Sequence, residues 1–100
     1  MLLYSGNLRM NDDAHRVTVG RDEINLTKSE YELLRLLLIN KGKPVSLHRI
    51  SAEAFGSCSS EGSIKVHVCN VRKKIGHWRI SSVYGYGYMM QDIAYFQRLI

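Results

Sequence analysis

Apolar residues recur at helical spacing between residues 63 and 75, and this segment is the centre of our interpretation of the chain. At about 100° per residue, one side of the predicted helix forms an apolar stripe, made of Ile64, Val68, Val71 and Ile75. The opposite side presents a second set spaced i, i+3, i+4, i+7, namely Val66, Cys69, Asn70 and Lys73. Basic residues at 65, 72 and 74 flank that outer side. One side therefore suits a protein core, and the other suits a polyanion.

The first 26 residues alternate between short apolar runs and turn-forming residues such as Gly6 and Gly20. Four strands are predicted by this alternation, at 2–4, 8–10, 16–19 and 23–26. They indicate a small antiparallel sheet, which needs a helix against its apolar face to be stable.

A capping box predicts where that helix begins. Thr27 and Glu30 are three residues apart. At this spacing the Thr27 hydroxyl accepts a hydrogen bond from the Glu30 amide, and the Glu30 carboxylate accepts one from the Thr27 amide. Apolar residues then cover most of the circumference, at 31, 33, 34 and 36–39. Such a helix is buried on more than one side, and Gly42 and Pro44 follow it as stop signals.

A second helix is predicted at 47–55, with Ser46 as its N-cap and a stripe made of Leu47, Ile50 and Ala54. Residues 56–62 have a loop composition. Ser60 or Ser63 then caps the helix described first. Two helices, a loop and a third helix form a helix-turn-helix arrangement with a lengthened turn.

The apolar period changes from 3.6 to 2 after residue 79. Residues 80–90 predict a β-hairpin whose tip holds Gly85 and Gly87, where a positive φ costs little. A hairpin directly after the third helix is a wing. Residues 91–100 carry apolar side chains at near-helical spacing, which predicts a short amphipathic extension that covers the chain's own core or forms a dimer contact.

Length and composition fit one small globular domain of 100 residues, with 45% apolar and 23% charged residues. No apolar run approaches the roughly 20 residues that cross a membrane, and no signal peptide appears, so we expect a cytoplasmic chain. The formal charge of +5 is distributed unevenly along the chain. Residues 1–61 are balanced, whereas 62–100 carry six basic side chains against Asp92 alone. This asymmetry favours a polyanion partner, and a solvated basic face is the alternative.

Catalytic and metal chemistry are not expected. No paired carboxylates, nucleophile–base set or phosphate-binding loop occurs at a usable spacing. The two cysteines, Cys58 and Cys69, match no zinc pattern even with His67 nearby. We therefore predict no enzyme activity, no cofactor and no metal.

Three stretches together resemble the DNA-binding effector domain of OmpR/PhoB-type response regulators. Residues 26–34, LTKSEYELL, are similar to LTxxEYxLL of that family; 64–75, IKVHVCNVRKKI, to VDVHIxxLRKKL; and 80–88, ISSVYGYGY, to IxTVxGxGY. The resemblance implies an α+β winged helix-turn-helix over residues 1–90, with an N-terminal four-stranded sheet, three helices and a C-terminal hairpin, followed by an extension at 91–100. It also implies promoter binding, commonly as head-to-tail dimers on direct repeats.

Three departures from the family pattern affect these expectations. Lys65 stands where the family has an aspartate, and Tyr84 where it often has an arginine that enters a minor groove. No receiver domain precedes the predicted sheet. We therefore expect either an isolated effector domain or a stand-alone regulator.

Within this resemblance, the outer side of the helix at 63–75 reads bases in the major groove. Asn70 pairs with adenine, Val66 and Cys69 contact thymine methyl groups, and Lys73 reaches the groove or its rim. Contacts to the DNA backbone are expected from Ser63, Lys65, His67, Arg72, Lys74, Tyr84 and Tyr86. For His67, packing against a neighbouring helix is an equal alternative.

Two further contacts and a second function remain open. Residues 55–61 correspond to the loop through which family members touch RNA polymerase, and an ordinary connector is equally compatible with their composition. Residues 91–100 are the candidate dimer segment. The competing function is a protein-interaction winged helix that docks on RNA polymerase or on a partner regulator.

Overall fold

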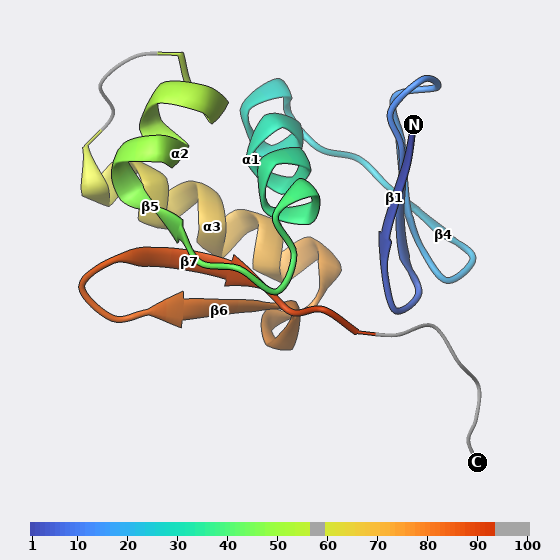
Figure 1. The fold of residues 1–100 in the computed structure, drawn as a ribbon. Helices are drawn as coiled ribbons and strands as arrows, with labels where there is room; N and C mark the ends of the chain where they lie inside the picture. Colours follow the sequence, from blue (N-terminus) through green and yellow to red (C-terminus); the bar gives the residue numbers. More distant parts are fainter. Residues whose placement is uncertain (57–59, 94–100) are drawn as a thin grey trace.

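Two small antiparallel sheets pack against a group of helices, one beside the helices and one below them in the view of Figure 1. The computed structural model describes residues 1–56 and 60–93. The elements follow in the order β1 Leu2–Ser5, β2 Leu8–Asn11, β3 Arg16–Val19, β4 Asp22–Ile24, α1 Lys28–Ile39, β5 Val45–Ser46, α2 Leu47–Ala54, α3 Glu61–Ile75, the 3₁₀ turn η1 His77–Arg79, β6 Ile80–Val83 and β7 Gly87–Met90. This arrangement confirms the predicted α+β winged helix.

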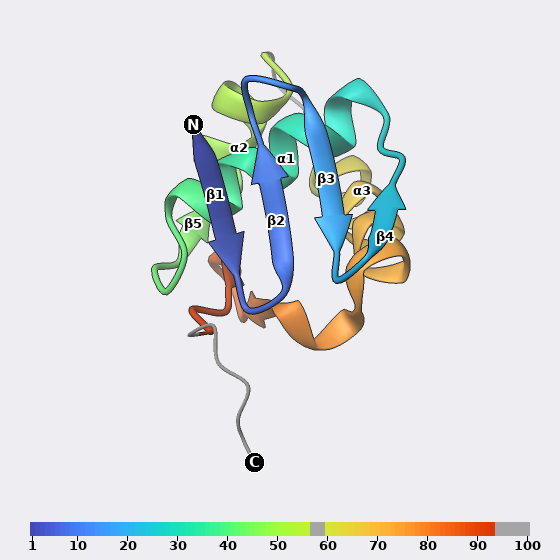
Figure 2. The ribbon, with the colours of Figure 1, turned by 90° about the vertical axis from the view of Figure 1, so that its right-hand side faces the viewer.

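The N-terminal sheet is an antiparallel meander in the order β1-β2-β3-β4. Figure 2 looks onto its outer face, with α1 behind it. The inner face is apolar, because Leu8, Met10 and Val17 alternate inward and are buried against the helices. The last strand is shorter than predicted and ends at Ile24, since the next residues lead into the cap of α1.

Helix α1 begins with the predicted capping box. The Glu30 amide donates to the hydroxyl of Thr27 at 3.2 Å, and the Thr27 amide donates to the Glu30 carboxylate at 3.1 Å. Leu33, Leu34 and Leu37 are completely buried, as a helix packed on several sides requires. The expectation that Ile39 is buried too is wrong, because 46% of it is exposed. It stands two residues after Leu37 and so points to the opposite side of the helix.

The second sheet has the order β5-β7-β6, so the wing hairpin also pairs with the short strand before α2. Gly85 occupies the hairpin tip with φ +72°, as predicted. The prediction that Gly87 lies at the hairpin tip with a positive φ is wrong, because this glycine lies in β7 opposite Ser46. A Cβ there would overlap the carbonyl oxygen of Val45. Close approach of β5, and not a positive φ, therefore requires glycine at this position.

Helix α3 begins at Glu61, two residues earlier than predicted. Of the two candidate caps it uses Ser60, whose hydroxyl accepts from the Ser63 amide at 3.1 Å. The apolar stripe predicted for this helix is buried in full: Ile64, Val68, Val71 and Ile75. The helix ends at Gly76, whose φ of +113° is accessible mainly to glycine.

Arg79 joins the end of α3 to the first sheet, although the sequence counted it among the basic residues available to a polyanion. It is buried, and its guanidinium donates to the carbonyl oxygens of Ile75 at 2.7 Å and Ser5 at 3.2 Å, and to the side chain of Asn7. Burial lowers the pKa of this group. Arg79 is thus a structural residue.

The chain returns to the first sheet after the wing, where the Gly6 amide donates to the carbonyl oxygen of Ile93 at 2.8 Å. Most of the predicted amphipathic extension, at 94–100, lies outside the described residues, as do 57–59. Among the described helices, none combines the length and the apolar character that crossing a lipid bilayer requires.

Candidate nucleic-acid interface

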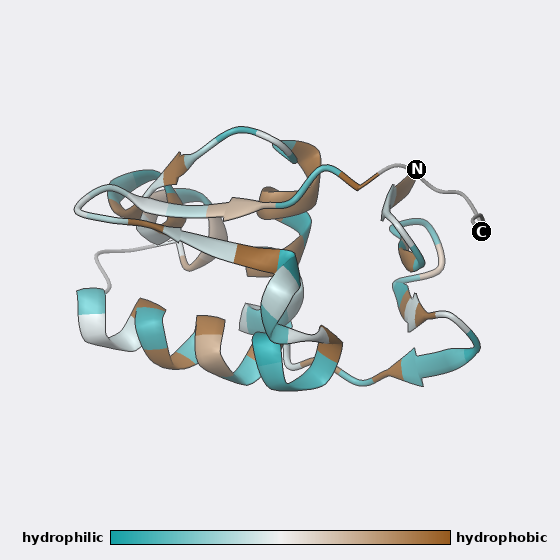
Figure 3. Ribbon diagram, turned by 90° about the horizontal axis from the view of Figure 1, so that it is seen from below, coloured by the Kyte–Doolittle hydropathy of each residue, from teal (hydrophilic) through white to brown (hydrophobic). Residues whose placement is uncertain are grey.

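Helix α3 presents a continuous outer side to solvent, opposite its buried stripe. Figure 3 shows the hydropathy changing from turn to turn along this helix. The four predicted base readers share the outer side: Val66 is 58% exposed, Lys73 is exposed, and Cys69 and Asn70 are half-buried. Cys69 carries a free thiol. The structure thus brings an amide, an ammonium and two apolar groups onto one helix face.

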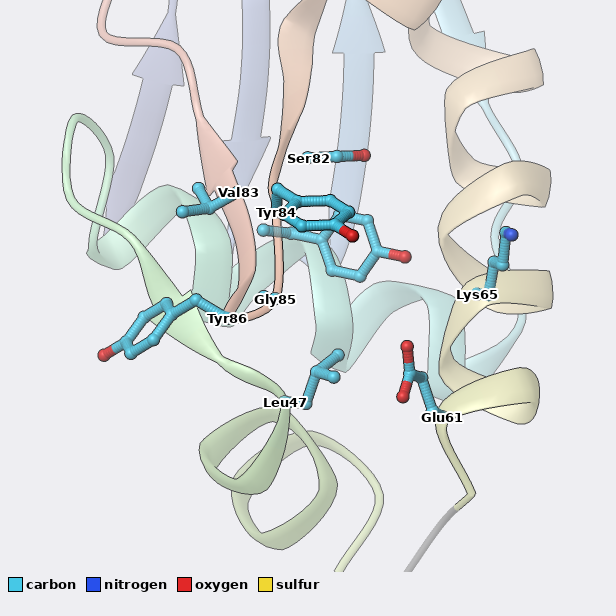
Figure 4. Close-up of a pocket in the computed structure, with 10 residues that line it drawn as sticks. Leu47, Glu61, Lys65, Ser82, Val83, Tyr84, Gly85 and Tyr86 are labelled. Atoms are coloured by element: carbon cyan, nitrogen blue, oxygen red, sulfur yellow. The ribbon is translucent and has the colours of Figure 1, made fainter.

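A cleft of about 390 Å³ separates the first half of α3 from the wing. Its walls include Glu61 and Lys65 from α3 and Ser82, Tyr84 and Tyr86 from the wing. Figure 4 shows the Glu61 side chain pointing from α3 into this space. The cleft therefore offers one cation, one carboxylate and several hydroxyl groups between two protruding elements.

The wing tip is open to solvent. Tyr84 is fully exposed next to Gly85, and Tyr86 is exposed by half. The Tyr86 carbonyl oxygen accepts from the Leu47 amide at 3.0 Å, so the hairpin is tied to the start of α2. Tyr88 is buried beneath the hairpin.

His67 lies against α2. Its ring is half-buried, with Nδ1 2.8 Å from the carbonyl oxygen of Ser63 and its centroid 4.8 Å from that of the Phe55 ring. The structure therefore places this residue in the packing position weighed as the alternative to a DNA contact.

Arg72 points to the wing. Its Nε and Nη2 donate to the carbonyl oxygen of Ile80 at 3.1 and 2.7 Å, and Nη2 also donates to the Ser82 hydroxyl at 3.1 Å. The guanidinium carbon lies 5.6 Å from the centroid of the Tyr88 ring. A residue predicted to contact phosphate thus fastens α3 to the hairpin.

Lys74 points to α1. Its Nζ lies 2.7 Å from Oε1 of Glu30, a carboxylate that also accepts from the backbone of the α1 cap. Burial opposes ionisation of Glu30, but the hydrogen bonds from Lys74 and Thr27 outweigh it and lower the pKa of the carboxyl below its usual value. Glu30 and Lys74 therefore form a charged pair at neutral pH.

A separate cluster fastens α1 to the N-terminal sheet. The Tyr31 hydroxyl donates to Asp12 at 2.8 Å, Arg35 lies 3.1 Å from the same carboxylate, and the ring of His15 stacks on Tyr31 at 3.8 Å. Burial and the bond to Asp12 raise the pKa of Tyr31 to about 12. This cluster belongs to the fold and lies away from α3.

Among the exposed polar residues of the cleft, the sequence does not predict Glu61 and Ser82. The loop composition of residues 56–62 places Glu61 before the predicted helix, whereas the structure makes it the first residue of α3. Its position one residue after Ser60, a competent N-cap, was the signal that could have located it. Ser82 alternates with its neighbours on the wing, and a strand pattern alone does not say which face meets α3.

Comparison with known proteins shows that this chain is similar to transcriptional regulatory proteins. The family model described as "Transcriptional regulatory protein, C terminal" matches residues 21–90. The chain is 38% identical over 94 residues to the response regulator protein PmrA of Pseudomonas aeruginosa, covering 92% of this chain and 42% of PmrA. It therefore spans about two-fifths of the length of that relative.

Solved structures agree on the fold. The DNA-binding domain of CpxR from Escherichia coli superposes with a TM-score of 0.84 at 28% identity, covering 94% of this chain and 99% of that domain. The RstA DNA-binding domain of Klebsiella pneumoniae, solved in complex with the RstA box, superposes with a TM-score of 0.81. It covers 91% of this chain and 97% of the RstA domain, and at 20% identity it shows the shared fold alone.

Proposed function

The chain belongs to the family of C-terminal domains of transcriptional regulatory proteins, and from that membership and the geometry of α3 and the wing we propose that it is a sequence-specific, double-stranded DNA-binding transcription regulator. The family is a class of transcription regulators and not a class of enzymes. Promoter DNA is the proposed partner, with α3 in the major groove and residues 80–90 on the adjacent backbone or minor groove.

The cleft between α3 and the wing is the observation that carries the proposal. A major groove of B-DNA admits one α-helix. A single sugar–phosphate backbone separates that groove from the neighbouring minor groove, so a helix and a hairpin in adjacent grooves must hold this backbone between them. Lys65, Ser82 and Tyr84 line the cleft and supply the ammonium and hydroxyl groups that commonly bind phosphate.

The outer side of α3 supplies the base readers. We assign Asn70 to adenine, Val66 and Cys69 to thymine methyl groups, and Lys73 to the groove or its rim. Their exposure on one helix side supports this assignment. Ser63, Lys65, Tyr84 and Tyr86 are assigned to the backbone.

We extend the proposal to assembly and location. Head-to-tail dimers on direct repeats are the family arrangement that the sequence resembles, and residues 91–100 are the candidate dimer segment. Residues 55–61 are the candidate contact with RNA polymerase. Parts of both segments, 57–59 and 94–100, lie outside the described residues. The matched relatives are bacterial, so the proposed location is a bacterial cytoplasm.

Selection of binding sites from random duplex DNA tests the proposal. We expect one motif to be enriched, as a direct repeat one helical turn apart, and a salt titration to separate that duplex from a scrambled one. Equal, weak binding to both duplexes with a parallel loss in salt would leave only non-specific phosphate contact. That result would favour the protein-interaction alternative instead.

A further inference from the structure

We propose that Lys74 acts through Glu30 as a positioning residue: the ion pair sets the angle of α3 against α1, and Lys74 does not contact DNA. This inference rests on the proposed function, since the angle of α3 matters only if its outer side reads bases. It reassigns one residue that the family resemblance would place on a phosphate.

The pair joins two helices across the domain. Glu30 and Lys74 are 44 residues apart in the chain, and the ammonium lies 2.7 Å from the carboxylate. Only 6% of the Glu30 side chain is exposed, against 38% of the Lys74 side chain. The carboxylate is therefore a fixed point inside the domain, and the lysine reaches inward to it from the edge of α3.

The ion pair between Glu30 and Lys74 depends on the relative orientation of its two groups, unlike the apolar contacts between α1 and α3. Leu34 of α1 and Val68 of α3 are buried in the same apolar core, and apolar contact is non-directional, so it tolerates small rotations of α3. A charged hydrogen bond at 2.7 Å requires both distance and angle. The pair therefore selects one orientation of the second half of α3, the half that carries Asn70 and Lys73.

Electrostatics argue against a phosphate contact. If Lys74 turned toward DNA, it would leave an ionised carboxylate buried without its cation, which is strongly unfavourable. Glu30 also cannot turn away, because the same Oε1 accepts from the Thr27 amide in the capping box. The pair carries no net charge, so it adds little to the attraction of α3 for DNA.

Two substitutions separate positioning from phosphate binding. Glu30→Gln keeps an oxygen acceptor for the Thr27 amide and removes only the charge, and Lys74→Gln removes the cation. We expect each to weaken binding to the selected duplex by on the order of tenfold, the range for residues that act without touching the ligand. The Glu30→Gln loss is decisive, because this change makes the chain more positive and would otherwise strengthen DNA binding. The double variant should lose no more than either single one.

Asp12→Asn is the matched control, since it removes a carboxylate partner of α1 on the sheet side, away from α3. It makes the same change in net charge as Glu30→Gln, so it should not weaken DNA binding. In DNA-free chains, amide NMR signals of α3 should shift in Glu30→Gln and not in Asp12→Asn. Lys74→Arg, which can still pair with Glu30, should restore specific affinity.

Opposite results would overturn the inference. A phosphate contact predicts that Lys74→Gln weakens selected and scrambled duplexes alike and lowers the salt slope by about 1, while Glu30→Gln binds as tightly as wild type or tighter. If Glu30→Gln does not fold, the salt slope of Lys74→Gln decides alone. A wild-type chain that fails to prefer the selected duplex would overturn the proposed function itself, and with it any DNA role for the pair.

Discussion

Arg72 donates two hydrogen bonds from one guanidinium to the carbonyl oxygen of Ile80, at 3.1 and 2.7 Å. Arg72 lies on α3 and Ile80 begins the wing, so this contact sets the spacing between the two elements that line the cleft. A planar guanidinium suits this task, because several of its N–H donors point in fixed directions.

Arg72→Lys tests that relationship, because it keeps the positive charge and removes the planar set of N–H donors. We expect specific affinity to fall by on the order of tenfold with an unchanged salt slope, since the cleft loses its shape while the charge count stays the same. Fluorescence anisotropy on the selected duplex measures both quantities. Full affinity in Arg72→Lys together with a loss in Arg72→Gln would instead indicate a direct phosphate contact.

Gly87→Ala should destabilise the fold. The added Cβ would overlap the Val45 carbonyl oxygen and lie 2.9 Å from its carbonyl carbon, so β5 must separate from the wing. We expect a loss of about 3 kcal/mol in the free energy of unfolding, at the upper end for overpacking. Urea denaturation measures it. Gly85→Asn at the open hairpin tip is the control and should cost less, because Asn tolerates a positive φ.

The elements that were predicted correctly from sequence share a local cause. The capping box at Thr27 and Glu30, the apolar stripe of α3 and the alternation in the wing each depend on residues a few positions apart. Local spacing carries that information without any knowledge of the fold. Ser60 and Ser63 show its limit, because both have cap chemistry and only the folded chain selects Ser60.

The partners of the basic residues on α3 could not be predicted in this way. A wheel projection places Arg72 and Lys74 on the flanks of the outer side, where a lysine or an arginine has room to reach DNA, and it places His67 beside the apolar stripe. Their partners come instead from α2, the wing and α1, and Glu30 is 44 residues from Lys74. Such contacts depend on how elements pack, which single-sequence periodicity does not encode.

The raised pKa of Tyr31 predicts that the stability of the fold decreases at alkaline pH. Because the folded state raises the pKa of Tyr31 from 10.0 to about 12, its contribution to stability is present below pH 10 and is lost as the pH rises toward 12. Tyr31→Phe should cost about 1 kcal/mol at pH 7 through the lost hydrogen bond to Asp12. Its deficit against wild type should shrink between pH 10 and 12. Parallel stability curves across that range would contradict the assignment.

Glu61 should restrain non-specific binding, because its carboxylate lines the cleft in which we place a phosphate backbone. Glu61→Gln is expected to tighten binding to selected and scrambled duplexes alike, by about threefold for an exposed charge. Glu53→Gln makes the same change in net charge on α2, where Glu53 pairs with Arg49. It should have no such effect. Equal gains in both variants would mean that net charge, and not position in the cleft, is responsible.

Asn70 and Lys65 should separate base reading from backbone contact. Asn70 lies on the outer side of α3, whereas Lys65 lines the backbone cleft. Asn70→Ala should relax discrimination by roughly 1–3 kcal/mol at a single base pair of the selected site, because one bidentate amide contact disappears. Lys65→Ala should weaken every duplex similarly and lower the salt slope by about 1. A panel of duplexes with one base pair changed at a time, titrated at two salt concentrations, measures both effects. Equal loss on selected and random DNA in Asn70→Ala would remove its role as a base reader, and the specificity would then have to come from Val66, Cys69 and Lys73 on the same side of the helix.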